Sequence, residues 1–90
     1  MNPKYCTKIF PTEELRNKLV QVGVPRYKHD IGNMSEMLPK SCKIIKGSLW
    51  CVNYDYVSNR NRLYISKKAI TLASAMGLML EFLLKEGIVK

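Results

Sequence analysis

The spacing of apolar residues predicts a helix that begins after Pro11 and ends at Gly23. Leu15, Leu19 and Val22 fall on one helical face at spacings of four and three, with polar residues between them. A threonine and two glutamates follow the proline, and these residues suit the amino end of a helix. The glycine and a proline two residues later are typical of a helix end.

Beyond this helix, residues 25–34 show no period, so the sequence predicts a loop there. Residues 35–38 have room for one helical turn before Pro39, and residues 42–46 form a candidate short strand.

Residues 48–65 have the pattern of a β-hairpin. Residues 48–57 are rich in aromatic and β-branched side chains, and residues 62–65 form the returning strand after a turn at Asn59-Arg60. This register pairs Tyr56 with Leu63 and Tyr54 with Ile65. Alternation then gives a core face of Trp50, Val52, Tyr54, Tyr56, Leu63 and Ile65, and an outer face of Asn53, Asp55, Arg62 and Tyr64. We expect Trp50 to be largely buried against the C-terminal helix.

The C-terminal pattern predicts a long helix from Lys67 to about Glu86, with Ser66 as its cap. It is apolar almost all round, so it should be buried on more than one side. A subunit interface in a homodimer or higher homo-oligomer is one explanation, and coverage by the first helix and the sheet is the other. The candidate interface residues are Ala69, Ala73, Met76, Gly77 and Leu80.

A chain of 90 residues suits one domain, 1–90. The expected fold class is α+β: an N-terminal helix, a small antiparallel sheet of two or three strands, and the long helix across the sheet. The helix is too short and too interrupted by Glu81 to span a membrane.

The charge is strongly positive, with 15 Lys and Arg against 7 Asp and Glu and a net charge of +8. Such an excess favours anionic partners. The predicted anion-binding site lies at the end of the hairpin, where an exposed aromatic stands among four cations: Arg60, Arg62, Tyr64, Lys67 and Lys68. A second basic cluster comprises Lys40, Lys43 and Lys46. The alternative interpretation of these three lysines is an ordinary solvent-exposed face that binds nothing.

Candidate chemistry is sparse, so we expect no enzyme, no metal and no cofactor. His29 is the one histidine, and Cys6, Cys42 and Cys51 lack the spacing of a zinc module or a disulfide scaffold. The glycines do not form a phosphate-binding loop. The N-terminal residues also lack the apolar core of a signal peptide, which favours a reducing cytoplasm.

Several motifs together resemble those of small uncharacterised phage and prophage proteins. They are Pro11-Thr12-Glu13-Glu14-Leu15, Gly23-Val24-Pro25, Ser35-Glu36-Met37-Leu38-Pro39, Trp50 and Leu72-Ala73-Ser74-Ala75. The sequence departs from that group in lacking a Pro-rich lead-in and in having Ser74 where Asp is common. The resemblance implies a mobile-element accessory protein that acts in a bacterial host, and it supplies no catalytic motif.

Charge and resemblance together predict a non-enzymatic binding protein that blocks or sequesters an anionic partner. That partner is an acidic surface of a host protein, such as a defence component, or a nucleotide. The alternative is a nucleic-acid-binding regulator that uses the basic hairpin.

Overall fold

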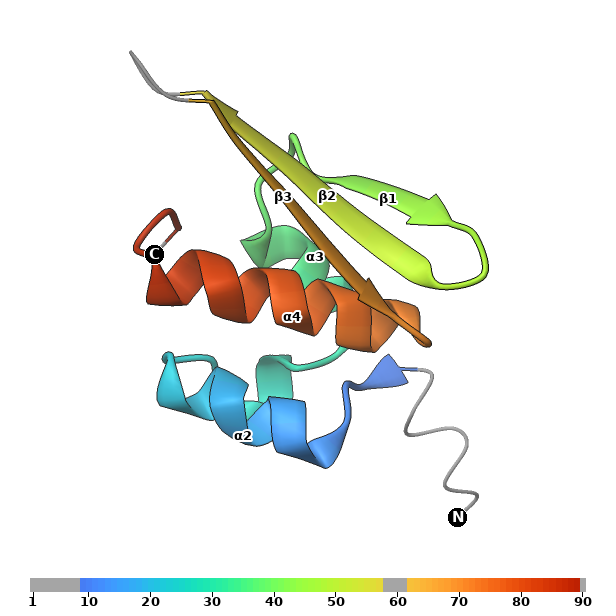
Figure 1. Cartoon of the computed structure of the whole chain (residues 1–90). Coiled ribbons are helices and arrows are strands. Elements are labelled where there is room, and N and C mark those ends of the chain that lie inside the picture. Colours follow the sequence, from blue (N-terminus) through green and yellow to red (C-terminus); the bar gives the residue numbers. More distant parts are fainter. Residues whose placement is uncertain (1–8, 58–61, 90) are drawn as a thin grey trace.

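Helix α4 (Leu72–Lys85) lies between a three-stranded sheet on one side and an N-terminal helix on the other (Figure 1). The computed structural model describes residues 9–57 and 62–89. Helices α2 (Glu13–Gln21) and α3 (Ile31–Met37) pack on α4, as do two strands of the sheet. The α+β class is therefore confirmed, with the C-terminal helix packed on the sheet.

The N-terminal helix was predicted correctly. Thr12 is the N-cap of α2, and its hydroxyl accepts a hydrogen bond from the Leu15 amide at 3.4 Å. Leu15 and Leu19 are buried, and Gly23 ends the segment with a φ of 100°. A positive φ of this size suits glycine at a helix end.

The loop predicted for residues 25–34 is wrong. This segment contains a short 3-10 helix η1 (Arg26–Lys28) and the start of α3. Asp30 is the N-cap of α3, since its carboxylate accepts hydrogen bonds from the Asn33 amide at 3.2 Å and side chain at 2.6 Å. The aspartate cap therefore outweighs the turn tendency of the Gly-Asn pair that follows it.

Three antiparallel strands form the sheet in the order β1 (Lys43–Lys46), β2 (Trp50–Val57) and β3 (Arg62–Ala69). The observed register pairs Tyr54 with Ile65 and Tyr56 with Leu63, as predicted. Val52, Tyr54 and Ile65 are buried on the face towards α4. Trp50 is on this face but only partly buried, which is less than expected, and Lys46 Nζ lies 5.1 Å from the centre of its ring.

The predicted start of the C-terminal helix is wrong by five residues. Lys67 and Lys68 belong to β3, which continues to Ala69, and the helix cap is Thr71 rather than Ser66. The Thr71 hydroxyl accepts a hydrogen bond from the Ser74 amide at 3.2 Å. Pairing with the first residues of β2 extends the returning strand, which local sequence alone does not reveal.

The candidate oligomer interface needs a matching correction. Ala73, Met76, Gly77 and Leu80 are buried by the chain's own elements, and Ala69 lies on β3 rather than on the helix. A Cβ at Gly77 would lie 2.9 Å from the Leu15 side chain and 3.2 Å from Pro11. The small-residue stripe therefore receives α2 and the segment before it, and it cannot receive a second copy.

Candidate anion-binding surface

The sheet has one face towards α4 and one face on which none of the described helices packs (Figure 1). Side chains alternate between the two faces, so the paired residues of adjacent strands share a face. Asp55 pairs with Tyr64 and Asn53 with Ser66, and these residues belong to the outer face together with Lys43 on β1. The outer face therefore presents polar and charged side chains that no described helix covers.

The predicted hairpin cluster is only partly assembled. Arg62, Tyr64 and Lys68 lie on the outer face of β3, at alternate positions of the strand. Lys67 lies on the opposite face, where its Nζ is 4.6 Å from the centre of the Phe82 ring on α4. Arg60 lies outside the described residues. The prediction placed both lysines on a helix, and the strand instead turns them to opposite faces.

Arg62 is held by an ion pair. Its Nη2 lies 2.7 Å from Asp55 Oδ2, and its Nε donates to both carboxylate oxygens at 3.2 Å. These hydrogen bonds lower the pKa of Asp55, and the charge of Lys43 contributes further. Asp55 thus places one negative charge among the cations of the outer face, which reduces their pull on a simple anion.

The second predicted cluster is divided in the same way. Lys43 lies on the outer face opposite Asn53, whereas Lys46 is turned to the other face beside Trp50. Lys40 is exposed in the connection between α3 and β1. The three lysines therefore do not form one patch.

Sequence reasoning missed a polar row in the middle of the outer face. The Cys51 thiol donates to Asn53 Oδ1 at 3.0 Å and lies 3.1 Å from the Ser66 hydroxyl. The cross-strand neighbour of Cys51 is Lys68. Alternation along β2 and β3 could have predicted this row, but only if the returning strand had been extended to its true end at Ala69.

Positive charge is concentrated in the sheet. The three strands carry one acid, Asp55, against five bases: Lys43, Lys46, Arg62, Lys67 and Lys68. The other described residues carry six bases, which are Arg16, Lys18, Arg26, Lys28, Lys40 and Lys85. They also carry six acids, which are Glu13, Glu14, Asp30, Glu36, Glu81 and Glu86. The excess positive charge of the described chain thus lies in the sheet.

Exposed apolar side chains accompany this charge. Ile44, Ile45, Leu49, Val57 and Tyr64 are exposed and lie on the strands or directly before β2. All four residues of β1 are exposed. A surface that mixes cations with exposed apolar groups is typical of a protein-binding face.

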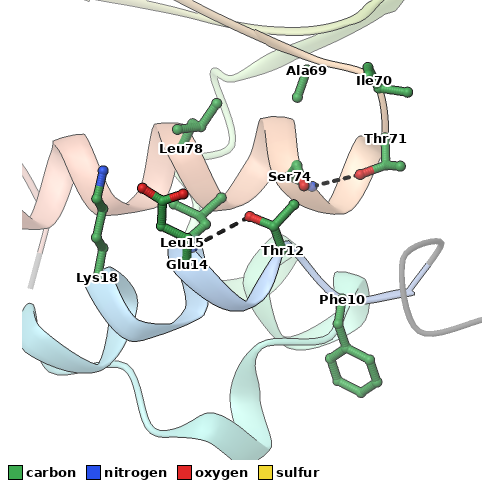
Figure 2. A pocket seen from close by; sticks show the side chains of 10 residues that line it. All are labelled: Phe10, Thr12, Glu14, Leu15, Lys18, Ala69, Ile70, Thr71, Ser74 and Leu78. Atoms are coloured by element: carbon green, nitrogen blue, oxygen red, sulfur yellow. Dashed lines mark hydrogen bonds between the residues drawn. The ribbon is translucent and has the colours of Figure 1, made fainter. Parts of the chain in front are cut away.

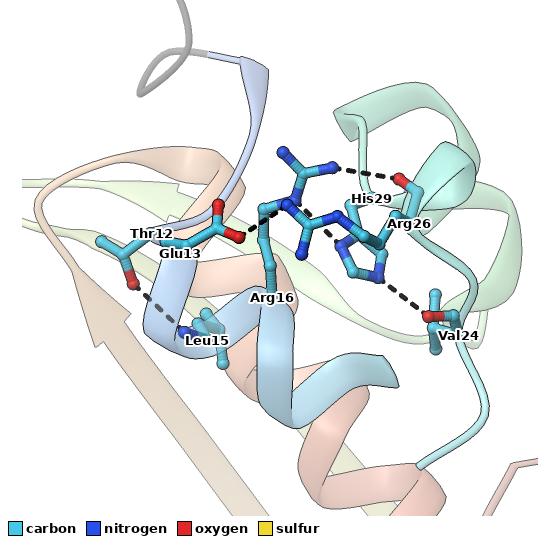
Figure 3. Close-up of polar contacts among 7 residues, drawn as sticks. All are labelled: Thr12, Glu13, Leu15, Arg16, Val24, Arg26 and His29. Carbon is cyan, nitrogen blue, oxygen red and sulfur yellow. Dashed lines mark hydrogen bonds and ion pairs between the residues drawn. The ribbon is translucent and has the colours of Figure 1, made fainter. Parts of the chain in front are cut away.

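His29 is fully buried and has a structural role (Figure 3). Its Nε2 donates to the Val24 carbonyl at 2.9 Å, and its Nδ1 accepts from Arg16 Nε at 3.1 Å, so the ring is neutral. Burial lowers the pKa of His29, and the nearby charges of Arg16 and Arg26 act in the same direction. Both ring nitrogens are engaged, which leaves neither nitrogen for catalysis or for a metal.

The cysteines likewise do not assemble a site with His29 within residues 9–57 and 62–89. No group of three His, Cys, Asp or Glu side chains in that part of the chain could hold a metal ion. Burial raises the pKa of the Cys42 thiol, which keeps that group protonated. Cys6 lies outside the described residues.

Comparisons with known proteins give no family assignment: no family model, curated protein or solved structure matches this chain. The resemblance to phage and prophage proteins therefore stays a prediction. Among the described helices, none combines the length and the hydropathy that crossing a membrane requires.

Proposed function

We propose that this protein binds an acidic surface of another protein through the outer face and β1 edge of its sheet, and blocks that surface without catalysing a reaction. The observation that carries the proposal is the charge separation: the strands hold five bases and one acid, whereas the other described residues hold six of each. Complementary charge speeds encounter and orients the two partners.

The mixture of groups favours a protein partner over a nucleic acid. Ile45 and Val57 are exposed beside the cations, and apolar side chains gain free energy when a protein surface covers them. Asp55 would repel a phosphate backbone, whereas an opposing protein surface can place a donor there. The resemblance to phage proteins supports a partner in the bacterial host.

A nucleic-acid-binding regulator is the second candidate, and Tyr64 is the observation that favours it. The ring is 65% exposed and stands between Arg62 and Lys68 on one face of β3. An exposed aromatic flanked by cations can stack on an unpaired base while the cations contact phosphates.

The experiment compares two double charge reversals after capture of partners from a bacterial lysate treated with nuclease. Lys43→Glu with Lys68→Glu alters the outer face, and Lys28→Glu with Lys85→Glu makes the same change in the helices. Any captured protein is then purified and its affinity is measured for each variant. We expect the sheet reversal to weaken binding at least about tenfold, or about 1.4 kcal/mol, and the helix reversal to have little effect.

Equal loss in both variants would show that only net charge matters and would contradict the sheet assignment. Capture that disappears with nuclease, together with binding of a single-stranded oligonucleotide that Tyr64→Ala weakens, would replace the proposal with the second candidate.

A further inference from the structure

A groove lies between α2 and α4, on the side of the molecule where the end of β3 meets α4 (Figure 2). Its volume is about 550 Å³. Ser74 and Leu78 on α4 line it together with Leu15 and other residues of α2, and the caps of the two helices, Thr71 and Thr12, lie at its end. This groove exposes the part of α4 that neither the sheet nor α2 covers.

An exposed isoleucine stands at the rim of this groove. Ile70, between β3 and α4, is 83% exposed, the largest value among the exposed apolar residues of the described chain. Leu78 on the groove wall is partly buried and packs at the edge of the core. The described residues therefore leave an apolar side chain uncovered beside an apolar hollow, which is a feature of interaction sites.

The α2 wall of the groove carries one charge of each sign. Glu14 and Lys18 both line the groove and lie one helical turn apart. Within residues 9–57 and 62–89, neither forms an ion pair. Figure 2 shows both side chains extending from α2 in the direction of α4, whereas the Phe10 ring points away from α4. Arg16 lies 4.6 Å from the centre of that ring.

The α2 wall of one copy is complementary in charge to the α2 wall of a second copy, because it carries one acid and one base one helical turn apart. If two copies meet about a two-fold axis perpendicular to α2, their α2 helices run antiparallel, and Glu14 of one copy can face Lys18 of the other. Ile70 lines the same groove, so a copy seated on the groove would also cover that side chain. The helical side of the described chain has equal numbers of acids and bases, so this contact avoids the repulsion that two sheets would meet.

We propose that the groove between α2 and α4 is the interface of a symmetric homodimer. The dimer buries Ile70 and pairs Glu14 with Lys18 of the second copy. It leaves both sheets free on the outside, so each dimer presents two binding faces. This interface uses none of the buried α4 residues that sequence reasoning selected.

The first test is sedimentation velocity of the full chain from micromolar to near-millimolar concentration, for Ile70→Glu and Ile45→Glu. Both isoleucines are exposed, at 83% and 53%, so neither change should unfold the protein, and circular dichroism checks this. We expect wild type and Ile45→Glu to form dimers. Ile70→Glu should dimerise at least about tenfold more weakly.

The second test exchanges the charges on α2. Glu14→Lys alone and Lys18→Glu alone each place like charges opposite one another and should weaken the dimer. The double variant with both changes restores the pairing and the net charge of +8, and it should dimerise as wild type does. Residues 14 and 18 are also i,i+4 neighbours on α2, so urea denaturation of each variant must show that the loss and the rescue concern dimerisation and not the stability of the helix.

A wild-type chain that remains monomeric over the whole concentration range overturns the proposal. So does a dimer that Ile45→Glu disrupts and Ile70→Glu does not, because that result would place the interface on the sheet. Failure of the double charge exchange to restore the dimer overturns the antiparallel pairing of α2. The sheet reversals described for partner binding do not touch this groove, so the two proposals fail separately.

Discussion

The helical side and the sheet of this protein differ in what their side chains do. Eight residues of α4 are buried, and the charges around the described helices balance. In β1 all four residues are exposed, and the three strands together carry five bases against one acid. The comparison separates a region that supplies stability from a region available for recognition.

The geometry of α4 explains this difference. One helix covers a strip of a sheet, and α4 packs on β2 and β3. The face of β1 and the whole outer face of the sheet therefore keep their contact with solvent, although several apolar residues lie there. Substitutions in the two regions should thus have opposite consequences for stability and binding.

The largest effect on stability is expected from Leu80→Ala. Leu80 is fully buried on α4, and removing its side chain should lower the free energy of unfolding by about 2–5 kcal/mol through lost burial and a residual cavity. Ile45→Ala removes a similar side chain from a site that is 53% exposed, and it should cost within about 0.5 kcal/mol. Urea denaturation measures both. Similar losses for the two variants would break the distinction between the regions.

Gly77→Ala tests the close approach of α2 to α4. Alanine favours a helix by about 1 kcal/mol over glycine, but its Cβ would lie 2.9 Å from Leu15 Cδ2 and 3.2 Å from Pro11 Cγ. Both neighbours are buried, so we expect the overpacking cost of about 1–3 kcal/mol to prevail and stability to fall. A higher midpoint in urea would mean that α2 moves aside easily.

The sequence predicted correctly those elements that are determined by residues close together in the chain. The α2 cap and its glycine end lie within a few residues of one another, and the hairpin register follows from its turn and alternation. The start of α4 was different, because Ser66 and Thr71 both suit an N-cap. Pairing of Lys68 and Ala69 with the start of β2 decides between them, and that contact joins residues far apart in sequence.

The candidate site was less predictable than the fold for the same reason. Assigning Lys67 to a strand instead of a helix turns it away from Lys68 and towards Phe82. The ion pair between Asp55 and Arg62 was also outside the prediction, although both residues were placed on the outer face. Net charge showed that cations are in excess, but only the strand alternation shows which of them share a face.

A smaller, pH-dependent effect is expected on the helical side. His29 is held neutral, and its pKa is lowered chiefly by burial, so the unfolded chain binds the proton more readily. Stability should therefore be full above the ordinary histidine pKa of about 6.5 and fall as the pH drops below it. Urea titrations at several pH values measure this loss.

His29→Gln serves as the control for that titration. The variant removes the titrating ring and should flatten the dependence between neutral and mildly acidic pH, whatever its own stability. Asp30 and Asp55 have lowered pKa values and titrate in more acidic solution, so they stay charged in this range. An unchanged slope in His29→Gln would assign the dependence to another group.

The smallest effect on stability, and the sharpest test of the sheet, comes from Asp55→Asn. The ion pair with Arg62 is exposed, so its loss should change the free energy of unfolding very little. The substitution also removes the one acid of the strands and releases Arg62.

The matched control is Glu36→Gln, at an exposed site on α3, which raises the net charge by the same unit in the helical region. A protein approaching an anionic surface turns its most positive face towards it, so a charge added to the sheet should count for more. On a cation-exchange column, Asp55→Asn should therefore elute at higher salt than Glu36→Gln. Elution of the two variants together would show that the charge separation has no consequence for binding.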